Sequence, residues 1–182
     1  MTNILFIYGS LRKQSSSKAL TKALAERLGG QCHVTIAQIG DFPHFNSDVK
    51  PNSAVSTFID QIAAADGVVI VTPEYNYSVP GPLKNAIDWA SRPALNSVFK
   101  GKPVFVISVS AGALGGVRAQ AHLKYILNGM LAQVFPSPEI VVAHSVAAVE
   151  DGKFTNDATL DFASENLRGF LDLLGASENV PA

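Results

Sequence analysis

Short apolar runs rich in β-branched residues alternate along this chain with longer amphipathic stretches, and this alternation constrains the fold more than any other feature. The runs Val68–Val71 and Val104–Ile107 contain no polar residue. Strands of that composition are buried on both faces, as in a parallel sheet covered by helices on both sides. The pattern therefore predicts an α/β fold built on a doubly wound parallel sheet.

Turn residues and helix-start residues divide this pattern into five strands and five helices. We expect the strands at Ile4–Tyr8, Cys32–Ala37, Gly67–Thr72, Pro103–Val109 and Val134–Val142. We expect the helices at Ser16–Leu28, Val55–Ala65, Gly81–Ala90, Gly116–Leu131 and Asp157–Leu174. Residues 39–53 and 143–156 are expected to be surface loops, and residues 1–182 to form a single domain.

Charge, hydropathy and cysteine content indicate which partners and which cellular location to expect. The formal net charge of −1 provides no long-range field for nucleic acid or an anionic membrane, so small molecules are the expected partners. No apolar stretch approaches the length of a membrane span. The single cysteine, Cys32, cannot form an internal disulfide, and the first residues lack the composition of a signal peptide. We therefore expect a cytoplasmic protein.

A cluster of hydroxylated residues follows the first predicted strand, in the segment GSLRKQSSS at 9–17. The first turn of a helix leaves backbone N–H groups without partners, and such groups bind anions. Additional donors suited to a terminal phosphate come from Arg12 and from the hydroxyls of Ser10, Ser15, Ser16 and Ser17. The segment predicts a mononucleotide phosphate site, with a simple helix N-cap in a solvated turn as the alternative.

Two further unusual segments follow the third and fourth predicted strands. Residues 72–89, TPEYNYSVPGPLKNAIDW, place two tyrosines on a turn stiffened by proline. Residues 110–120, SAGALGGVRAQ, form a glycine-rich turn whose amides can approach a flat ligand closely. Loops at the carboxyl ends of strands meet at the switch point of a doubly wound sheet. We therefore expect the three segments to surround one ligand that carries a phosphate and a planar ring.

Together the three segments resemble the NADPH-dependent FMN reductase family of flavodoxin-like proteins, which includes quinone and chromate reductases. The resemblance covers residues 3–142 and implies a five-stranded sheet of order 2-1-3-4-5. It also implies bound FMN, with NADPH or NADH as the hydride donor. The implied reaction is a ping-pong transfer of hydride through flavin N5 to quinones or similar acceptors such as chromate, azo dyes or free flavin.

The resemblance also assigns residues to the cofactor. It implies that the FMN phosphate is bound by Ser10, Arg12, Ser15, Ser16 and Ser17, although asparagine is commoner in the family at the position of Ser17. It implies that the isoalloxazine ring lies against the turn formed by Pro73, Glu74, Tyr75, Asn76 and Tyr77, whose backbone groups meet its polar edge. The other side of the ring is then lined by Ser110, Gly112, Gly115 and Gly116.

A flavin supplies the reactivity itself, so we expect no catalytic side chain. No metal site is expected either, because the four histidines show no ligand spacing with one another or with Cys32. Arg118 opens a predicted helix, where a cation opposes the helix dipole, so it needs an anionic partner. An intersubunit salt bridge is the preferred interpretation for Arg118, and a contact with the 2′-phosphate of NADPH is the alternative.

Two other functions compete with the reductase. Ser110 lies between a buried strand and a helix, as a hydrolase nucleophile would, with His144 downstream, but Ser108 stands where a nucleophile elbow needs glycine. A non-enzymatic FMN module, either an electron carrier or a redox-responsive binding protein, is the stronger alternative. Carriers of electrons between proteins usually have a strongly acidic face, which this near-neutral chain lacks.

The apolar and aromatic side chains of residues 75–82 are predicted to lie at the rim of a loop beside the flavin. Surfaces of this kind tend to be covered by a partner. We expect a homodimer with the flavin near the subunit interface, or a tetramer formed by paired dimers.

Overall fold

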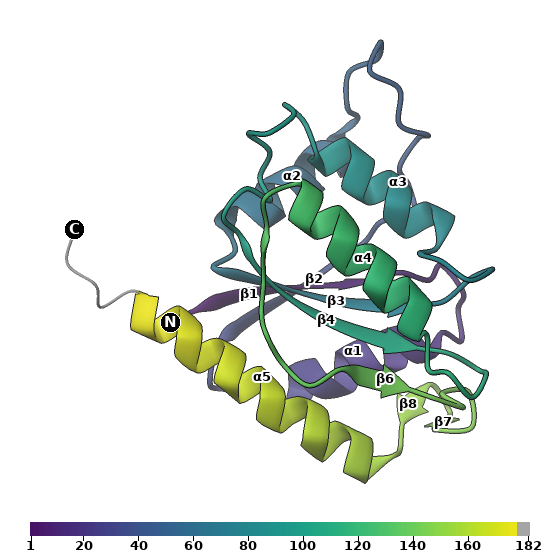
Figure 1. Cartoon of the computed structure of the whole chain (residues 1–182). Helices are drawn as coiled ribbons and strands as arrows, with labels where there is room; N and C mark the ends of the chain where they lie inside the picture. Colours follow the sequence, from purple (N-terminus) through teal and green to yellow (C-terminus); the bar gives the residue numbers. More distant parts are fainter. Residues whose placement is uncertain (178–182) are drawn as a thin grey trace.

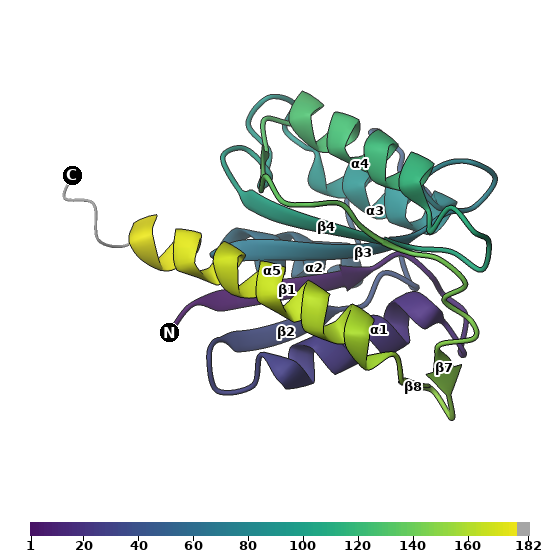
Figure 2. The same ribbon diagram turned by 60° about the horizontal axis from the view of Figure 1, so that its bottom comes forward.

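A central sheet separates two layers of helices (Figures 1 and 2). Its strands are β1 (Asn3–Tyr8), β2 (His33–Ala37), β3 (Gly67–Pro73), β4 (Pro103–Val109), β5 (Gln133–Val134) and β6 (Ile140–Val142). One face carries α1 (Ser16–Arg27) and α5 (Asp157–Ser177), and the other carries α2 (Ser53–Ala64), α3 (Gly81–Ala90) and α4 (Val117–Gly129). This computed structural model describes residues 1–177.

The strand order is β2-β1-β3-β4-β5, and all pairs in this sheet are parallel. The predicted flavodoxin-like sheet is therefore confirmed. The chain runs outward from β1 to β2 and then returns to place β3 on the other side of β1, so the direction of winding reverses between β1 and β3. Ligands bind beyond the carboxyl ends of the strands at such a reversal.

The prediction of one continuous fifth strand over Val134–Val142 is wrong. β5 pairs with the start of β4, where Val134 lies opposite Val104, and β6 pairs with its end, where Ile140 lies opposite Ile107. The residues between them include Pro136 and Pro138. Proline has no N–H to donate to the ladder, which interrupts the strand although the chain continues along the same neighbour.

The expectation that residues 143–156 form only a loop is also wrong. They include a small antiparallel hairpin of β7 (Val149–Glu150) and β8 (Lys153–Phe154). Asp151 and Gly152 connect its strands with φ angles of 48° and 76°. Two consecutive left-handed residues define the turn type that suits a two-residue hairpin, and Asp-Gly is a preferred pair for it.

Both faces of the sheet are buried, which explains why β3 and β4 are apolar throughout. On the face covered by α1 and α5, Phe105, Phe135 and Phe170 pack with ring centroids 5.4 to 5.8 Å apart. On the other face, Phe58 and Phe99 belong to a core between the strands and α2, α3 and α4. Within residues 1–177, no helix has the length and apolar character needed to cross a bilayer.

Candidate functional site

The three segments singled out in the sequence meet at the carboxyl edge of the sheet. The loop after β1 contacts the loop after β3 through the hydroxyls of Ser10 and Tyr75, which lie 2.8 Å apart. The loop after β3 contacts the start of α4 through Glu74 and Arg118. These contacts join the three segments into one continuous surface.

The loop after β1 is held close to β3 before it enters α1. The N–H of Gly9 donates to the carbonyl of Val71 at 3.0 Å, and a Cβ atom at Gly9 would lie 2.9 Å from Cδ of Pro73. Glycine is therefore needed here for the close approach of the two segments. Ser15 then caps α1, because its Oγ accepts a hydrogen bond from the N–H of Lys18 at 3.2 Å.

The start of α1 has the donors that an anion requires. The N–H groups of Ser16 and Ser17 have no protein acceptor within residues 1–177. The exposed guanidinium of Arg12 forms no ion pair with that part of the chain. A phosphate would satisfy both kinds of donor, so this loop fits the phosphate end of FMN.

The serine hydroxyls of this loop point to different partners. Ser15 and Ser17 are buried, and their Oγ atoms lie 2.8 Å apart. Ser16 is half-buried, and its Oγ lies 2.9 Å from Oγ of Ser145, which follows β6. Ser17 therefore offers its backbone N–H to an anion, while its hydroxyl is occupied inside the protein. A cavity of about 200 Å³ adjoins Ser16 and is lined by Arg12, Gln14, Ser16, Val146, Val149, Asp151 and Gly152.

The loop after β3 forms a tight turn with an exposed tip. Tyr75 and Ser78 exchange two backbone hydrogen bonds of 3.1 Å, and between them Asn76 and Tyr77 adopt φ angles of 47° and 67°. The N–H groups of Asn76 and Tyr77 lack protein acceptors in the described part of the chain, whereas that of Glu74 donates to the carbonyl of Val109 at 3.3 Å. Asn76 and Tyr77 can therefore present backbone donors to a ring, and the N–H of Glu74 is already used.

The side chain of Glu74 links this turn to α4. One carboxylate oxygen accepts hydrogen bonds from the N–H groups of Arg118 and Ala119 at 3.1 and 3.2 Å. The other accepts one from Nη1 of Arg118 at 3.0 Å. Arg118 thus has an anionic partner in its own chain, and its need for an anion is met without the intersubunit salt bridge that was the preferred interpretation. Sequence reasoning required an anion near Arg118 but missed Glu74, which lies 44 positions away.

The glycines after β4 are needed mainly for packing within the chain. A Cβ atom at Gly115 would lie 2.8 Å from the backbone carbon of Val141, and one at Gly116 would lie 3.0 Å from the carbonyl oxygen of Val109. Both residues are buried and have positive φ angles. Gly112 is exposed, and its N–H donates to Oγ of Ser110 at 3.1 Å. Of these positions, Gly112 is exposed and Ser110 is half-buried, whereas the other two are covered by the protein.

Sequence reasoning missed the segment after β6 as part of this edge. The N–H of Ser145 donates to the carbonyl of Ser110 at 2.9 Å, and the N–H of His144 donates to that of Gly112 at 3.2 Å. Because the segment follows a parallel strand, its place beside the other loops was available from the topology.

The geometry lends no support to the hydrolase alternative. The hydroxyl of Ser110 has Gly112 as its hydrogen-bond partner, and within residues 1–177 no hydrogen bond joins it to the ring of His144. The same residues contain no group of three His, Cys, Asp or Glu side chains that could hold a metal ion.

Comparison with known proteins identifies the family of this chain. The profile of the family described as NADPH-dependent FMN reductase matches residues 2–147, which include all three loops and the first residues after β6. The chain therefore belongs to this family, as the resemblance predicted. It is an oxidoreductase of a family whose cofactors are FMN and NAD(P)H.

Individual relatives match over nearly their whole length. A quinone reductase of Pseudomonas putida is 38% identical over 173 residues, which are 93% of this chain and 91% of the relative. A 2-hydroxy-1,4-benzoquinone reductase of a Burkholderia species is 38% identical over 170 residues, covering 92% and 89%. Among solved structures, the flavoenzyme FerB of Paracoccus denitrificans, an NAD(P)H:(acceptor) oxidoreductase, has a TM-score of 0.86 and 36% identity, covering 97% of this chain and 98% of FerB.

Proposed function

We propose that this protein is an FMN-containing NAD(P)H:quinone reductase. The observation that carries the proposal is the contact between Ser10 and Tyr75, 2.8 Å apart, which joins an anion-binding loop to an exposed turn with free backbone donors. A ligand with a phosphate at one end and a planar ring at the other suits these two features together. The quinone reductases among the relatives support the choice of acceptor.

In this proposal the phosphate lies at the start of α1 and the ring lies between the loops after β3 and β4. The phosphate is bound by Arg12, by the N–H groups of Ser16 and Ser17, and by hydroxyls of the loop after β1. Ser10 and Ser15 stabilise the conformation of that loop through their contacts with Tyr75 and with the N–H of Lys18. The ring contacts Pro73, Glu74, Tyr75, Asn76, Tyr77, Ser110 and Gly112, while Gly115 and Gly116 shape the loop beneath it.

Bound FMN would take a hydride from NAD(P)H and pass two electrons to the acceptor, so that a quinone gains that hydride and one proton from water to become a hydroquinone. The protein contributes placement and electrostatics. Backbone N–H groups of Asn76 and Tyr77 suit the edge where negative charge develops, because preorganised donors stabilise such charge without a titrating group. The tip of the turn is open, with 37% of Tyr75 and 68% of Tyr77 exposed.

An open site with aromatic walls favours one shared position for donor and acceptor. NAD(P)H and the quinone would then occupy it in turn, which gives ping-pong kinetics. The same openness gives weak discrimination among flat acceptors, so chromate, azo dyes and free flavins are proposed as additional acceptors.

Exposed apolar side chains surround the site. Leu11, Tyr77, Leu114 and Val146 lie on the loops at this edge and are each more than half exposed. Single exposed apolar residues are ordinary, but a group of them around one site favours a partner surface. We propose that a second copy of the chain covers this edge in a homodimer. The cytoplasmic location stays a prediction.

The visible spectrum of the purified protein, followed by release and identification of the chromophore, tests the cofactor. Oxidation of NADPH and NADH with 1,4-benzoquinone under anaerobic conditions then tests the reaction. We expect a flavin spectrum, bound FMN and turnover with at least one nicotinamide. If the protein binds FMN but shows no turnover, the alternative function as an electron carrier would be favoured. A colourless protein that does not take up added FMN would overturn the proposal.

A further inference from the structure

We propose that Glu74 is a positioning residue, which holds the turn at residues 75–78 at a fixed distance from α4 and thereby sets the gap that receives the flavin ring. The inference rests on the proposed function, because it takes the ring to lie between the loops after β3 and β4. It adds a role for a side chain that need not touch the ring.

The start of α4 lacks a cap of its own. Its N-cap is Gly116 in the left-handed conformation, and no side chain from that position caps the helix. The N–H groups of Arg118 and Ala119 instead find their acceptor in Glu74, which belongs to the loop after the neighbouring strand. A helix N-terminus favours a carboxylate through its unpaired N–H groups and its dipole. Capping of α4 therefore fixes Glu74, the residue directly before the turn at residues 75–78.

Arg118 extends this link to the tip of the turn. Its guanidinium donates to Glu74 and lies over the ring of Tyr77, with Cζ 4.4 Å from the ring centroid. A guanidinium over an aromatic face is an attractive arrangement. The far end of the turn is tied to the same helix, because Oγ of Ser78 lies 2.9 Å from Nδ1 of His122. The turn is thus attached to α4 at its start, its tip and its end.

The carboxylate of Glu74 binds α4 and not the proposed flavin ring. Both of its oxygens accept hydrogen bonds from α4, and its side chain is 11% exposed. Its negative charge is balanced locally by Arg118 and the helix terminus, so it opposes little of the charge that develops on a reduced flavin. Removal of this side chain would leave two N–H groups unpaired and release Arg118 from its position against Tyr77.

The test compares Glu74→Ala and Glu74→Gln with two controls. Ile62→Val, on the buried side of α2, removes one methylene and lowers stability without changing a residue of this edge. Asp157→Asn alters another carboxylate that is paired with an arginine in the first turn of a helix and, within residues 1–177, forms no hydrogen bond with the loops after β3 and β4. The measurements are the FMN dissociation constant by fluorescence titration, the midpoint potential of bound flavin, KM and kcat for the quinone, and Tm of the apoprotein.

We expect Glu74→Ala to raise the FMN dissociation constant about tenfold, the size of effect that loss of a helix cap and its ion pair produces. The midpoint potential should become more negative, because looser N–H donors stabilise the reduced ring less. Glu74→Gln should recover part of the affinity, since its amide oxygen still accepts from α4 but cannot pair with Arg118. Ile62→Val and Asp157→Asn should leave both quantities within about twofold of the wild type.

Three results would overturn the inference. One is unchanged FMN affinity and potential in Glu74→Ala. Another is a loss of FMN affinity in Ile62→Val as large as that in Glu74→Ala when the two variants have the same fall in Tm. Such a result would show that lower stability of the whole protein, and not the position of the turn, weakens FMN binding. The third is a midpoint potential that shifts equally in Glu74→Gln and Glu74→Ala while the FMN dissociation constant stays at the wild-type value in both, which would indicate that the charge acts on the ring and that the side chain does not position the turn. Failure of the wild-type chain to bind FMN would instead contradict the proposed function.

Discussion

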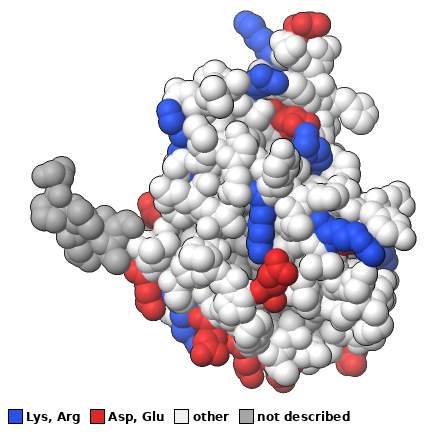
Figure 3. Space-filling view, viewed as in Figure 1, with Lys and Arg blue, Asp and Glu red and all other residues white. Residues whose placement is uncertain are grey.

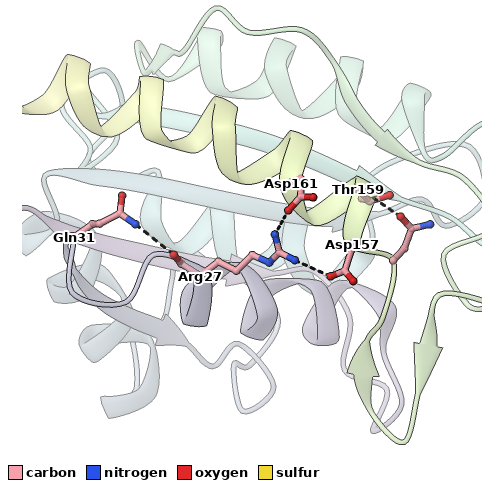
Figure 4. A network of polar contacts seen from close by, with 6 residues as sticks. Arg27, Gln31, Asp157, Thr159 and Asp161 are labelled. Atoms are coloured by element: carbon pink, nitrogen blue, oxygen red, sulfur yellow. Dashed lines mark hydrogen bonds and ion pairs between the residues drawn. The ribbon is translucent and has the colours of Figure 1, made fainter.

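The helices α4 and α5 both begin beside a carboxylate paired with arginine, and the two arrangements differ in where the carboxylate comes from. At α5, Asp157 lies in the helix itself, and Arg27 of α1 donates to both Asp157 and Asp161 (Figure 4). At α4, the carboxylate belongs to Glu74 in a separate loop. The α5 arrangement therefore joins two helices, whereas the α4 arrangement fixes a loop.

The two arrangements also differ in burial. The side chains of Asp157 and Asp161 are 82% and 70% exposed, against 11% for Glu74. Water and salt screen exposed ion pairs, which contribute about 0 to 1 kcal/mol, whereas a shielded carboxylate that satisfies helix donors contributes more. On the face shown in Figure 3, acidic and basic side chains are interspersed with uncharged ones. The same chemistry thus makes a weak surface link in one region and a positioning contact in the other.

The backbone at the start of α4 provides the largest expected effect. Gly116→Ala should lower the free energy of unfolding by about 2 to 3 kcal/mol, because its φ of 84° is strained for alanine and its Cβ would meet the carbonyl of Val109 at 3.0 Å. Urea denaturation measures this change. Gly30→Ala is the control, since Gly30 has a φ of 81° but nothing within 4 Å of its Cβ, and should lose only about 1 kcal/mol. Equal losses would show that the close packing at α4 contributes nothing.

Substitution of Arg12 should have the next largest effect, and it should change the free energy of FMN binding rather than the stability of the fold. Arg12→Ala should weaken FMN binding by about 1.5 to 3 kcal/mol, because a charge-assisted contact to phosphate is lost. Fluorescence titration with FMN measures it, and the Tm of the apoprotein should stay the same because Arg12 is exposed and has no ion pair in the described part of the chain. The exposed neighbour Lys13→Ala is the matched control. An affinity that is unchanged in Arg12→Ala would place the phosphate elsewhere.

Local sequence patterns were enough to predict the parts of the site that depend on neighbours in the chain. The apolar runs of β3 and β4 follow from adjacent residues, and the structure shows them where they were expected. The structure also shows Ser15 as the N-cap of α1, a role that the sequence offered for this serine cluster only as the alternative to phosphate binding. The Asp151-Gly152 turn was also local, but its strands are two residues each, too short for alternation to be recognised.

Contacts between distant segments could not be predicted in this way. Glu74 caps a helix 44 residues later, and Ser16 meets Ser145 at a separation of 129 residues. The glycines at 115 and 116 were correctly located as a turn, but the reason for them lies in the backbone of β4, of β6 and of the residue directly after β6. The contacts of all these residues with a cofactor stay predictions.

The local cap of α5 should have a moderate effect. Oδ1 of Asn156 accepts a hydrogen bond from the N–H of Thr159 at 2.9 Å, so α5 has the cap from its own sequence that α4 lacks. Asn156→Ala should lower the free energy of unfolding by about 1 kcal/mol, as loss of an N-cap does. Thermal denaturation measures it, with no change in FMN affinity. Asn166→Ala, at a half-buried position in the middle of the same helix, is the control and should change stability by less than about 0.5 kcal/mol. A loss of FMN binding in Asn156→Ala would remove the functional distinction between the two helix starts.

The ion pair at α5 should have the smallest effect and is the sharpest test of the comparison. Asp157→Asn should lower the free energy of unfolding by less than about 0.5 kcal/mol, because Asp157 is 82% exposed and Arg27 keeps Asp161 as a partner. Urea denaturation at low and at 1 M salt should show the difference from wild type shrinking as salt rises, since screening weakens exposed pairs first. A loss above about 1.5 kcal/mol, or one that salt does not reduce, would mean that burial does not separate the two arrangements, because the exposed pair would then match the expected effect of a buried cap.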